Sequence, residues 1–135
     1  MPSYTFSKEE RLKSEKILSR LFQRDSNSFS KFPIRIVWIE LNPAEVEEDT
    51  NPPLLQAAFT VPKRSFPKAV HRNKIKRKVR EAFRLHKHIL YERLPQKKHY
   101  RIMFIYTGKE ALSYDKIEAA MTNIIERLIE RSLKD

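Results

Sequence analysis

A stripe of evenly spaced basic side chains gives this chain its clearest capacity for chemistry. Its members recur at every fourth position and are Arg72, Lys76, Arg80 and Arg84. On a helix, residues four apart lie on the same face, so the four cations would form one surface. Only one acid, Glu81, lies between Lys63 and Lys87. Ion pairs within the helix therefore cannot cancel this charge, and the pattern predicts binding of a polyanion such as a phosphate backbone.

The charge of the whole chain is concentrated in the same region. Residues 61–101 hold 15 of the 28 Lys and Arg but only two acids, whereas the other 94 residues hold 13 basic and 15 acidic side chains. Most charge runs are solvated helix faces that bind nothing, but an imbalance of this size favours a nucleic-acid ligand. A membrane surface is disfavoured because no apolar stripe remains beyond what the core needs. Charge alone does not choose between RNA and DNA.

The composition indicates one soluble domain covering residues 1–135. A chain of 135 residues with 40% hydrophobic residues and eight Phe can bury a single core. It has no Cys, which excludes disulfides and thiolate metal sites. The N-terminus has no apolar run of signal-peptide length, and no stretch approaches the roughly 20 apolar residues of a membrane span. We therefore expect a cytoplasmic protein that does not contact membranes.

The N-terminal half predicts a helix followed by a strand. Ser7 and Glu10 have the spacing of a capping box, which indicates a helix from about Lys8 to Phe22. Residues 26–28 resemble a turn. The segment Phe32 to Leu41 is rich in β-branched and aromatic residues and is typical of a strand, with Phe32, Ile34, Ile36 and Trp38 on one face. Residues 42–53 combine prolines and acids and should form an exposed connection.

The C-terminal half predicts two strands and two helices. Leu54 to Val61 and residues 100–106 are typical of strands, and Gly108 marks a turn. A basic loop over residues 62–68 should lead into a helix from about Ala69 to Arg93. The face of that helix toward the sheet should contain Ile75, Val79, Ala82, His86 and Ile89. The last helix should run from about Tyr114 to Leu133.

These elements predict an α+β fold. The order α-β-β-α-β-α, with a possible extra short strand, favours a single-domain α-β sandwich in which about three helices pack on a small, mainly antiparallel sheet. A helical DNA-binding bundle fits less well because it would leave three strand signals unexplained.

The run AVHRNKIKRKVREAFR, residues 69–84, resembles the signature of the protein subunit of bacterial ribonuclease P. The matching residues are Ala69, Val70, Arg72, Asn73, Lys76, Arg77, Arg80, Glu81, Ala82, Phe83 and Arg84. The resemblance also covers the opening helix, the strand before the signature, and the closing strand and helix. Two departures stand out: Lys74 replaces the third residue of the family's Arg-Asn-Arg core, and the loop before the signature is one residue longer and contains extra proline.

The resemblance implies the fold, the partners and the mechanism. Family members have an α-β sandwich with a left-handed crossover around the basic helix, whereas most crossovers are right-handed. They assist the removal of the 5′ leader from precursor tRNA. The catalyst is the partner RNA, which binds Mg²⁺, and the protein holds no metal of its own. The protein should be monomeric before it assembles with the catalytic RNA and precursor tRNA.

Carried over by position, the resemblance assigns two surfaces. Contacts with the catalytic RNA would come from Arg72, Asn73, Lys74, Lys76, Arg77, Arg80 and Arg84, extended by Lys63, Arg64 and Lys68. A cleft for the single-stranded leader would be lined by Leu18, Phe22, Ile36 and Trp38. Unpaired bases stack on aromatic side chains, which suits Phe22 and Trp38 to that role. Each cleft residue could equally belong to the core.

Two alternatives from other classes remain open. A nuclease that needs no RNA would draw on His71, His86, His88 and His99 with Glu81 or Glu92, but no clustered carboxylate set or metal-binding motif accompanies them. A non-catalytic RNA-binding protein, such as a ribosomal protein, would share the charge and would need no cleft for a single strand.

Overall fold

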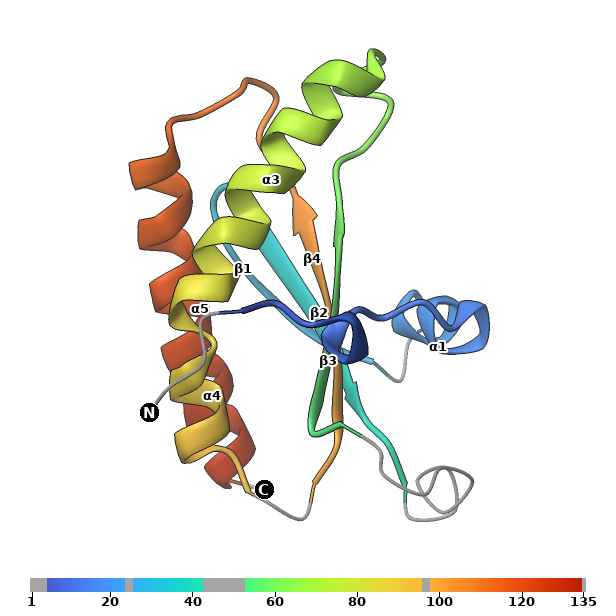
Figure 1. Ribbon diagram of the computed structural model, residues 1–135, viewed down its shortest axis with the longest axis vertical. Coiled ribbons are helices and arrows are strands. Elements are labelled where there is room, and N and C mark those ends of the chain that lie inside the picture. Colours follow the sequence, from blue (N-terminus) through green and yellow to red (C-terminus); the bar gives the residue numbers. More distant parts are fainter. Residues whose placement is uncertain (1–4, 24–25, 43–52, 96–97, 135) are drawn as a thin grey trace.

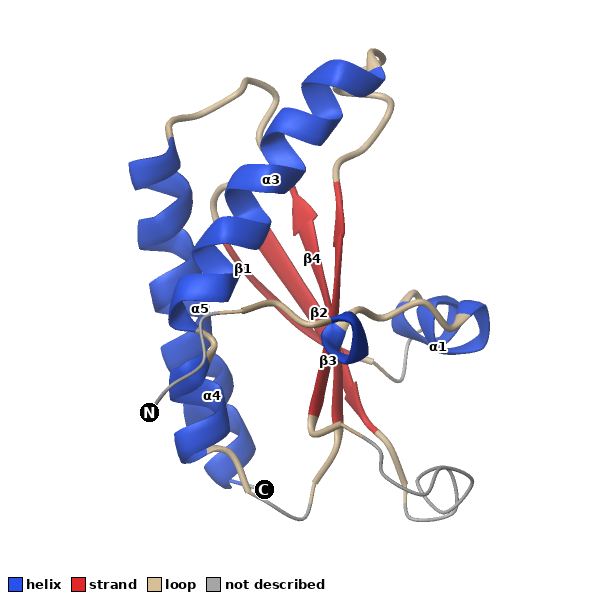
Figure 2. Cartoon of the chain, in the orientation of Figure 1, coloured by secondary structure: helices blue, strands red, loops and turns tan. Residues whose placement is uncertain are grey.

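One mixed sheet, drawn in red in Figure 2, forms the centre of the fold. The computed structural model describes residues 5–23, 26–42, 53–95 and 98–134. Their elements, in chain order, are η1 (Lys8–Glu10), α1 (Glu15–Leu21), β1 (Asn27–Lys31), β2 (Ile34–Glu40), β3 (Leu55–Thr60), α3 (Ala69–His86), α4 (His88–Arg93), β4 (Tyr100–Tyr106) and α5 (Tyr114–Lys134). The predicted α+β class is confirmed, including the extra strand.

The strands lie in the order β1-β2-β4-β3. The β1–β2 and β2–β4 pairs are antiparallel, whereas β3 and β4 are parallel neighbours. A parallel pair needs a connection that crosses back along the sheet, and here α3 and α4 supply it. Figure 1 shows α3, α4 and α5 on one side of the sheet and α1 on the other. The basic helix therefore belongs to a connection between two adjacent strands.

The face of the sheet toward α3 and α5 carries the main core. Alternate residues of every strand point to this face, and one row across the sheet consists of Phe29, Ile36, Phe104 and Phe59. The Phe59 and Phe104 rings stack with centroids 5.6 Å apart, and Phe83 of α3 lies 5.2 Å from Phe104. From α3, Ile75, Val79 and Ala82 are buried as predicted. One face of α3 is thus committed to the core.

The opposite face of the sheet carries a smaller apolar cluster beneath α1. Val37, Ile39 and Met103 of the sheet are buried against Leu12 and Leu21. Both faces of the sheet therefore carry apolar side chains, and those of the second face lie beneath α1.

The expected helix over residues 8–22 is wrong in its first half. The predicted capping box exists, but it closes only the short 3-10 turn η1. The chain then extends beside the edge strand β3, where the amide of Leu12 donates to the carbonyl of Ala57 at 3.0 Å. A new cap, Ser14, accepts from the amide of Ile17 and starts α1. Pairing with the sheet edge thus replaces the helix that local sequence favours.

Two other boundaries differ from the sequence prediction. The expected turn over residues 26–28 overlaps β1, which pairs with β2 from Asn27 onward. The expected single helix from Ala69 to Arg93 divides at Lys87 into α3 and α4. The acidic connection lies almost wholly outside the described residues.

Residues 5–12, here called the strap, run from the helix layer past the edge of β3 to α1 (Figure 1). Phe6 packs edge-on against Phe59 and Phe83, with ring centroids 5.7 and 6.0 Å apart. The side-chain amide of Gln56 donates to the carbonyl of Glu9 at 2.9 Å. The strap therefore covers the edge of β3 and determines where α1 begins.

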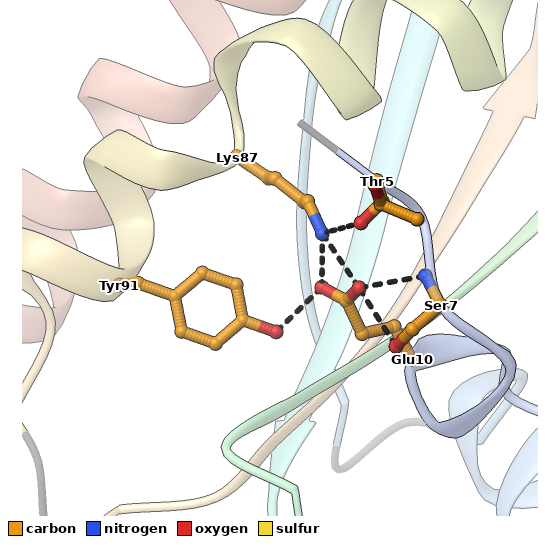
Figure 3. Close-up of polar contacts among 5 residues, drawn as sticks. All are labelled: Thr5, Ser7, Glu10, Lys87 and Tyr91. Carbon is orange, nitrogen blue, oxygen red and sulfur yellow. Dashed lines mark hydrogen bonds and ion pairs between the residues drawn. The ribbon is translucent and has the colours of Figure 1, made fainter. Parts of the chain in front are cut away.

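A buried ion pair fastens the strap to the helix layer (Figure 3). Lys87 Nζ lies 2.5 and 2.6 Å from the two carboxylate oxygens of Glu10 and also donates to the carbonyl of Thr5. Tyr91 donates its hydroxyl to Glu10 at 2.6 Å, and the amide of Ser7 donates at 2.9 Å. Glu10 and Lys87 are 8% and 2% exposed. The division between α3 and α4 coincides with this inward-turned lysine.

The carboxylate of Glu10 is held ionised by these donors. Burial raises its pKa, but the hydrogen bonds from Lys87, Tyr91 and Ser7 outweigh burial and place the pKa below the usual 4.5. The pKa of Tyr91 is raised by its own burial and by the hydrogen bond to Glu10.

No helix in the described part of the chain is long and apolar enough to cross a membrane.

Replacing Lys87 with methionine should destabilise the fold strongly. Lys87→Met leaves the Glu10 carboxylate buried without its cation, which should lower the free energy of unfolding by about 3–5 kcal/mol at neutral pH. Urea denaturation measures the effect. The double variant Glu10→Gln/Lys87→Met should recover part of the loss because no buried charge remains. A Lys87→Met protein as stable as the parent would contradict this account.

The same pair predicts a pH dependence. Since folding lowers the pKa of Glu10, its contribution should be complete above about pH 4.5 and should be lost as the pH falls below that value. Between pH 6 and pH 3, the parent should therefore lose more stability than Glu10→Gln.

Candidate nucleic-acid interface

The outward side of α3 presents cations that the protein itself does not neutralise. Within the described residues, no carboxylate forms an ion pair with the side chains of Lys63, Arg64, Lys68, Arg72, Lys74, Lys76, Arg77 or Arg80. Arg77 and Arg80 are exposed, as is Asn73, whose amide offers a donor and an acceptor. The helix buries Ile75, Val79 and Ala82 and so must turn this side to solvent. We call this outward side of α3 the basic face; its residues are Arg72, Asn73, Lys74, Lys76, Arg77, Arg80 and Arg84.

Two arginines in the C-terminal half of α3 have local partners. Arg84 donates from Nε to Glu81 Oε2 at 3.0 Å, and this bond lowers the pKa of Glu81. Arg80 lies over the ring of Phe59, 6.0 Å from its centroid. The one acid within the basic face is therefore already paired, which leaves the other cations available to a ligand.

Arg72 organises the loop that precedes α3. Its Nη1 donates to the carbonyls of Phe66 and Pro67 at 2.9 and 2.7 Å. Phe66 is buried and packs 5.9 Å from Tyr106, so it anchors the loop in the core. Lys63, Arg64 and Lys68 are exposed. Arg72 thus contributes to the surface by holding the loop as well as by its own charge.

A cationic hollow of about 630 Å³ opens beside this loop. Its polar lining combines three cations with hydroxyl groups, and its members are Arg35, Arg64, Lys109, Ser65 and Thr107. The cations come from β2, the loop over residues 62–68 and the segment after β4. Pro62, Ile105 and Tyr106 complete the lining, and none of its described residues is an acid. An oxyanion is the ligand that such a lining suits.

Gly108 allows the segment after β4 to fold back closely. A Cβ atom at this position would lie 2.9 Å from the ring of Tyr106. The hydroxyl of Tyr106 donates to the carbonyl of Glu110 at 2.6 Å and accepts from the amide of Leu112 at 3.1 Å. These contacts place Thr107 and Lys109 at the hollow.

The four residues predicted to line the leader cleft do not lie on one surface. Phe22 ends α1 with 69% of its surface exposed, and Leu18 is partly buried against the cluster beneath α1. Ile36 and Trp38, however, lie on the other side of the sheet, where they are 0% and 5% exposed. Trp38 packs edge-on against Phe29 with centroids 5.4 Å apart. Assigning these two to the cleft was wrong, because they form the main core.

The neighbours of those residues on β2 face α1 instead. Arg35 is exposed and Val37 is buried on that side, and Ile105 of β4 pairs with Arg35 in the register. Ile105 belongs both to the hollow and to the cluster beneath α1, so the two features adjoin. Arg35 and Lys109 were not predicted from the sequence. Because side chains alternate along a strand, the odd-numbered residues of β2, which include Arg35, were the alternative candidates for the cleft.

The residues considered for protein-borne catalysis lie in separate surroundings. His86 Nε2 contacts Glu118 Oε2 of α5 at 3.1 Å, and His99 Nδ1 contacts the carbonyl of Pro53 at 3.1 Å. His71 is exposed on the first turn of α3. Across the described part of the chain, no three His, Cys, Asp or Glu side chains form a group that could hold a metal ion.

Comparison with known sequences agrees with the basic signature. The family model for ribonuclease P matches residues 6–129. A ribonuclease P protein component from Porphyromonas gingivalis strain W83 is 30% identical over 128 residues, which cover 94% of this chain and 88% of the relative.

Solved structures share the fold. A ribonuclease P protein from Staphylococcus aureus superposes with a TM-score of 0.63 at 21% identity, covering 88% of this chain and 94% of that one. The ribonuclease P protein from Thermotoga maritima gives a TM-score of 0.64 at 22% identity, with 87% and 96% covered. At these identities the structures support the fold alone.

Stability measurements can test the reassignment of Trp38. Trp38→Ala removes a buried ring and should lower the free energy of unfolding by about 3–5 kcal/mol. Phe22→Ala, at an exposed helix end, should change it by no more than about 0.5 kcal/mol. Urea denaturation of the two variants makes the comparison. If Trp38→Ala barely changed the free energy of unfolding, Trp38 would not be a core residue and its assignment to the cleft would stand.

Proposed function

Since the chain belongs to the ribonuclease P protein family, we propose that its basic face binds the catalytic RNA of that ribonucleoprotein. In the complex, the protein assists endonucleolytic removal of the 5′ leader from precursor tRNA. The observation that carries the proposal is the basic face, where Lys74, Lys76 and Arg77 have no carboxylate partner among the described residues. RNA phosphates would supply the missing counter-charge.

The protein's share in the reaction is to position the RNA and to neutralise charge. The charged side chains of the basic face and the hollow end in ammonium and guanidinium groups, which do not ligate Mg²⁺, because this cation takes oxygen ligands. We therefore assign Mg²⁺ and the bond-breaking chemistry to the catalytic RNA. The protein would join that RNA as a monomer in the cytoplasm.

We assign the leader to the side of the sheet that carries α1. Phe22 is exposed there and can stack on an unpaired base. Arg35, Arg64 and Lys109 converge at the adjoining hollow and can neutralise the phosphates of the same strand. Leu18, which is partly buried against the cluster beneath α1, adds apolar surface on the same side of the sheet. This cleft replaces the one predicted on Ile36 and Trp38, which are buried in the main core.

Reconstitution tests the proposed function. A precursor tRNA is incubated at low Mg²⁺ with a bacterial ribonuclease P RNA, with this protein, or with both. Cleavage at the mature 5′ end should require both components. Salt-sensitive RNA binding without stimulation of cleavage would favour the ribosomal-type alternative, and cleavage by the protein alone would overturn the division of labour.

Arg77→Ala should weaken binding to the catalytic RNA by about tenfold, because one charged contact is lost. The magnitude of the slope of log K against log salt concentration should fall by about 0.7 to 0.9. Arg93→Ala is the matched control, since Arg93 lies on α4 and pairs with Glu126 at 3.0 Å. Equal effects of the two variants would show that net charge matters and the basic face does not.

Leader variants separate the second surface from the first. Phe22→Leu should weaken binding of leader-bearing precursor by about 5-fold to 100-fold and leave mature tRNA unaffected, whereas Phe22→Tyr keeps the ring and should bind normally. Arg35→Ala should likewise affect only the precursor. Binding of holoenzyme to both RNAs provides the measurement. Equal losses for precursor and mature tRNA would remove the leader from this cleft.

A further inference from the structure

A second hollow, of about 450 Å³, lies between α3 and α5. Its lining residues are Lys74, Arg77, Lys78 and Glu81 of α3 and Tyr114 of α5. The two helices pack against each other lower down and separate toward their N-terminal ends (Figure 1). Tyr114 lies outside the basic signature, and neither the resemblance nor the leader cleft gives it a role. We call this site the α3–α5 groove.

The groove is cationic. Lys74 and Arg77 are exposed, and no carboxylate in the described part of the chain pairs with either. Lys78 Nζ donates to the carbonyl of Leu112 at 3.1 Å, which ties the segment before α5 to α3 while keeping the charge at the groove. Glu81, the one acid among the described residues of the lining, accepts a hydrogen bond from Arg84 at 3.0 Å. The groove therefore attracts an anion.

Tyr114 adds an aromatic ring whose hydroxyl is already used. The hydroxyl donates to Glu118 Oε2 at 3.1 Å, and His86 Nε2 lies 3.1 Å from the same oxygen. Burial and this hydrogen bond raise the pKa of Tyr114 to about 12, so the phenol stays neutral. With its hydroxyl held on α5, Tyr114 offers the groove mainly its ring.

We infer that the α3–α5 groove holds an unpaired nucleotide of the catalytic RNA, with its base stacked on Tyr114 and its phosphate neutralised by Lys74 and Arg77. Three cations beside one ring match the two halves of a nucleotide, because bases stack on aromatic faces and phosphates seek cations. A continuous RNA helix would need only the charges, since its bases are not free to stack. The inference rests on the proposed function and adds a base contact to it.

Substitutions at position 114 separate stacking from charge. Tyr114→Leu should weaken binding of a bacterial ribonuclease P RNA by about tenfold, with no change in the salt slope because no phosphate contact is lost. Tyr114→Phe keeps the ring and should bind within about twofold of the parent. Lys74→Ala should instead reduce the magnitude of the slope of log K against log salt concentration. If Tyr114→Leu binds like the parent, the groove holds no base.

Photocrosslinking provides a measurement that a merely structural role would not produce. The photoreactive residue p-azidophenylalanine, placed at position 114, should crosslink to one single-stranded position of the RNA. The same residue at position 133, exposed at the other end of α5, should not crosslink. A crosslink to a fully paired helix, or none, overturns the inference. If the parent protein stimulates cleavage while these tests fail, only the inference is lost; a parent protein that does not stimulate cleavage removes the proposed function itself.

Discussion

The buried ion pair between Glu10 and Lys87 connects parts of the chain that are 77 residues apart, and the placement of α1 depends on it. One partner lies on the strap and the other lies where α3 gives way to α4. Because the strap then follows the edge of β3, the pair determines on which side of the sheet α1 begins. A buried pair is costly unless its remaining hydrogen-bonding positions are satisfied, and Tyr91, Ser7 and the carbonyl of Thr5 satisfy them.

The basic face imposes the opposite condition on α3. Its cations repel one another, and Glu81 can neutralise only Arg84. The helix tolerates this repulsion because its other side is fixed by burial of Ile75, Val79 and Phe83, which favours the fold independently of charge. A surface held in place by apolar packing can keep its charges unpaired for a ligand. The same arrangement explains why the free protein should be sensitive to salt and to polyanions.

The residue patterns along the chain predicted the helices and strands that make up most of the fold. The apolar stripes of α3 and α5 and the β-branched and aromatic residues of β2 and β4 were sufficient for the α+β class. The strap was missed because pairing of residues 11 and 12 with Ala57 at the sheet edge outweighs the helical preference of residues 8–22. Trp38 was placed on the wrong face because both faces of β2 are apolar and alternation does not tell which one α1 covers. The hollow could not be predicted, since positions 35, 64 and 109 meet only through the fold.

The two proposed RNA surfaces are joined through Arg72. Its guanidinium binds the carbonyls of Phe66 and Pro67, while Arg64, in the same loop, lines the hollow on the side of the leader cleft. RNA phosphates that approach the start of α3 would either compete with these two carbonyls for the guanidinium of Arg72 or be positioned by that guanidinium. The conformation of residues 62–68 therefore affects both surfaces at once. In this loop the longer, proline-containing sequence departs from the family pattern, and its consequences should reach the leader cleft as well as the basic face.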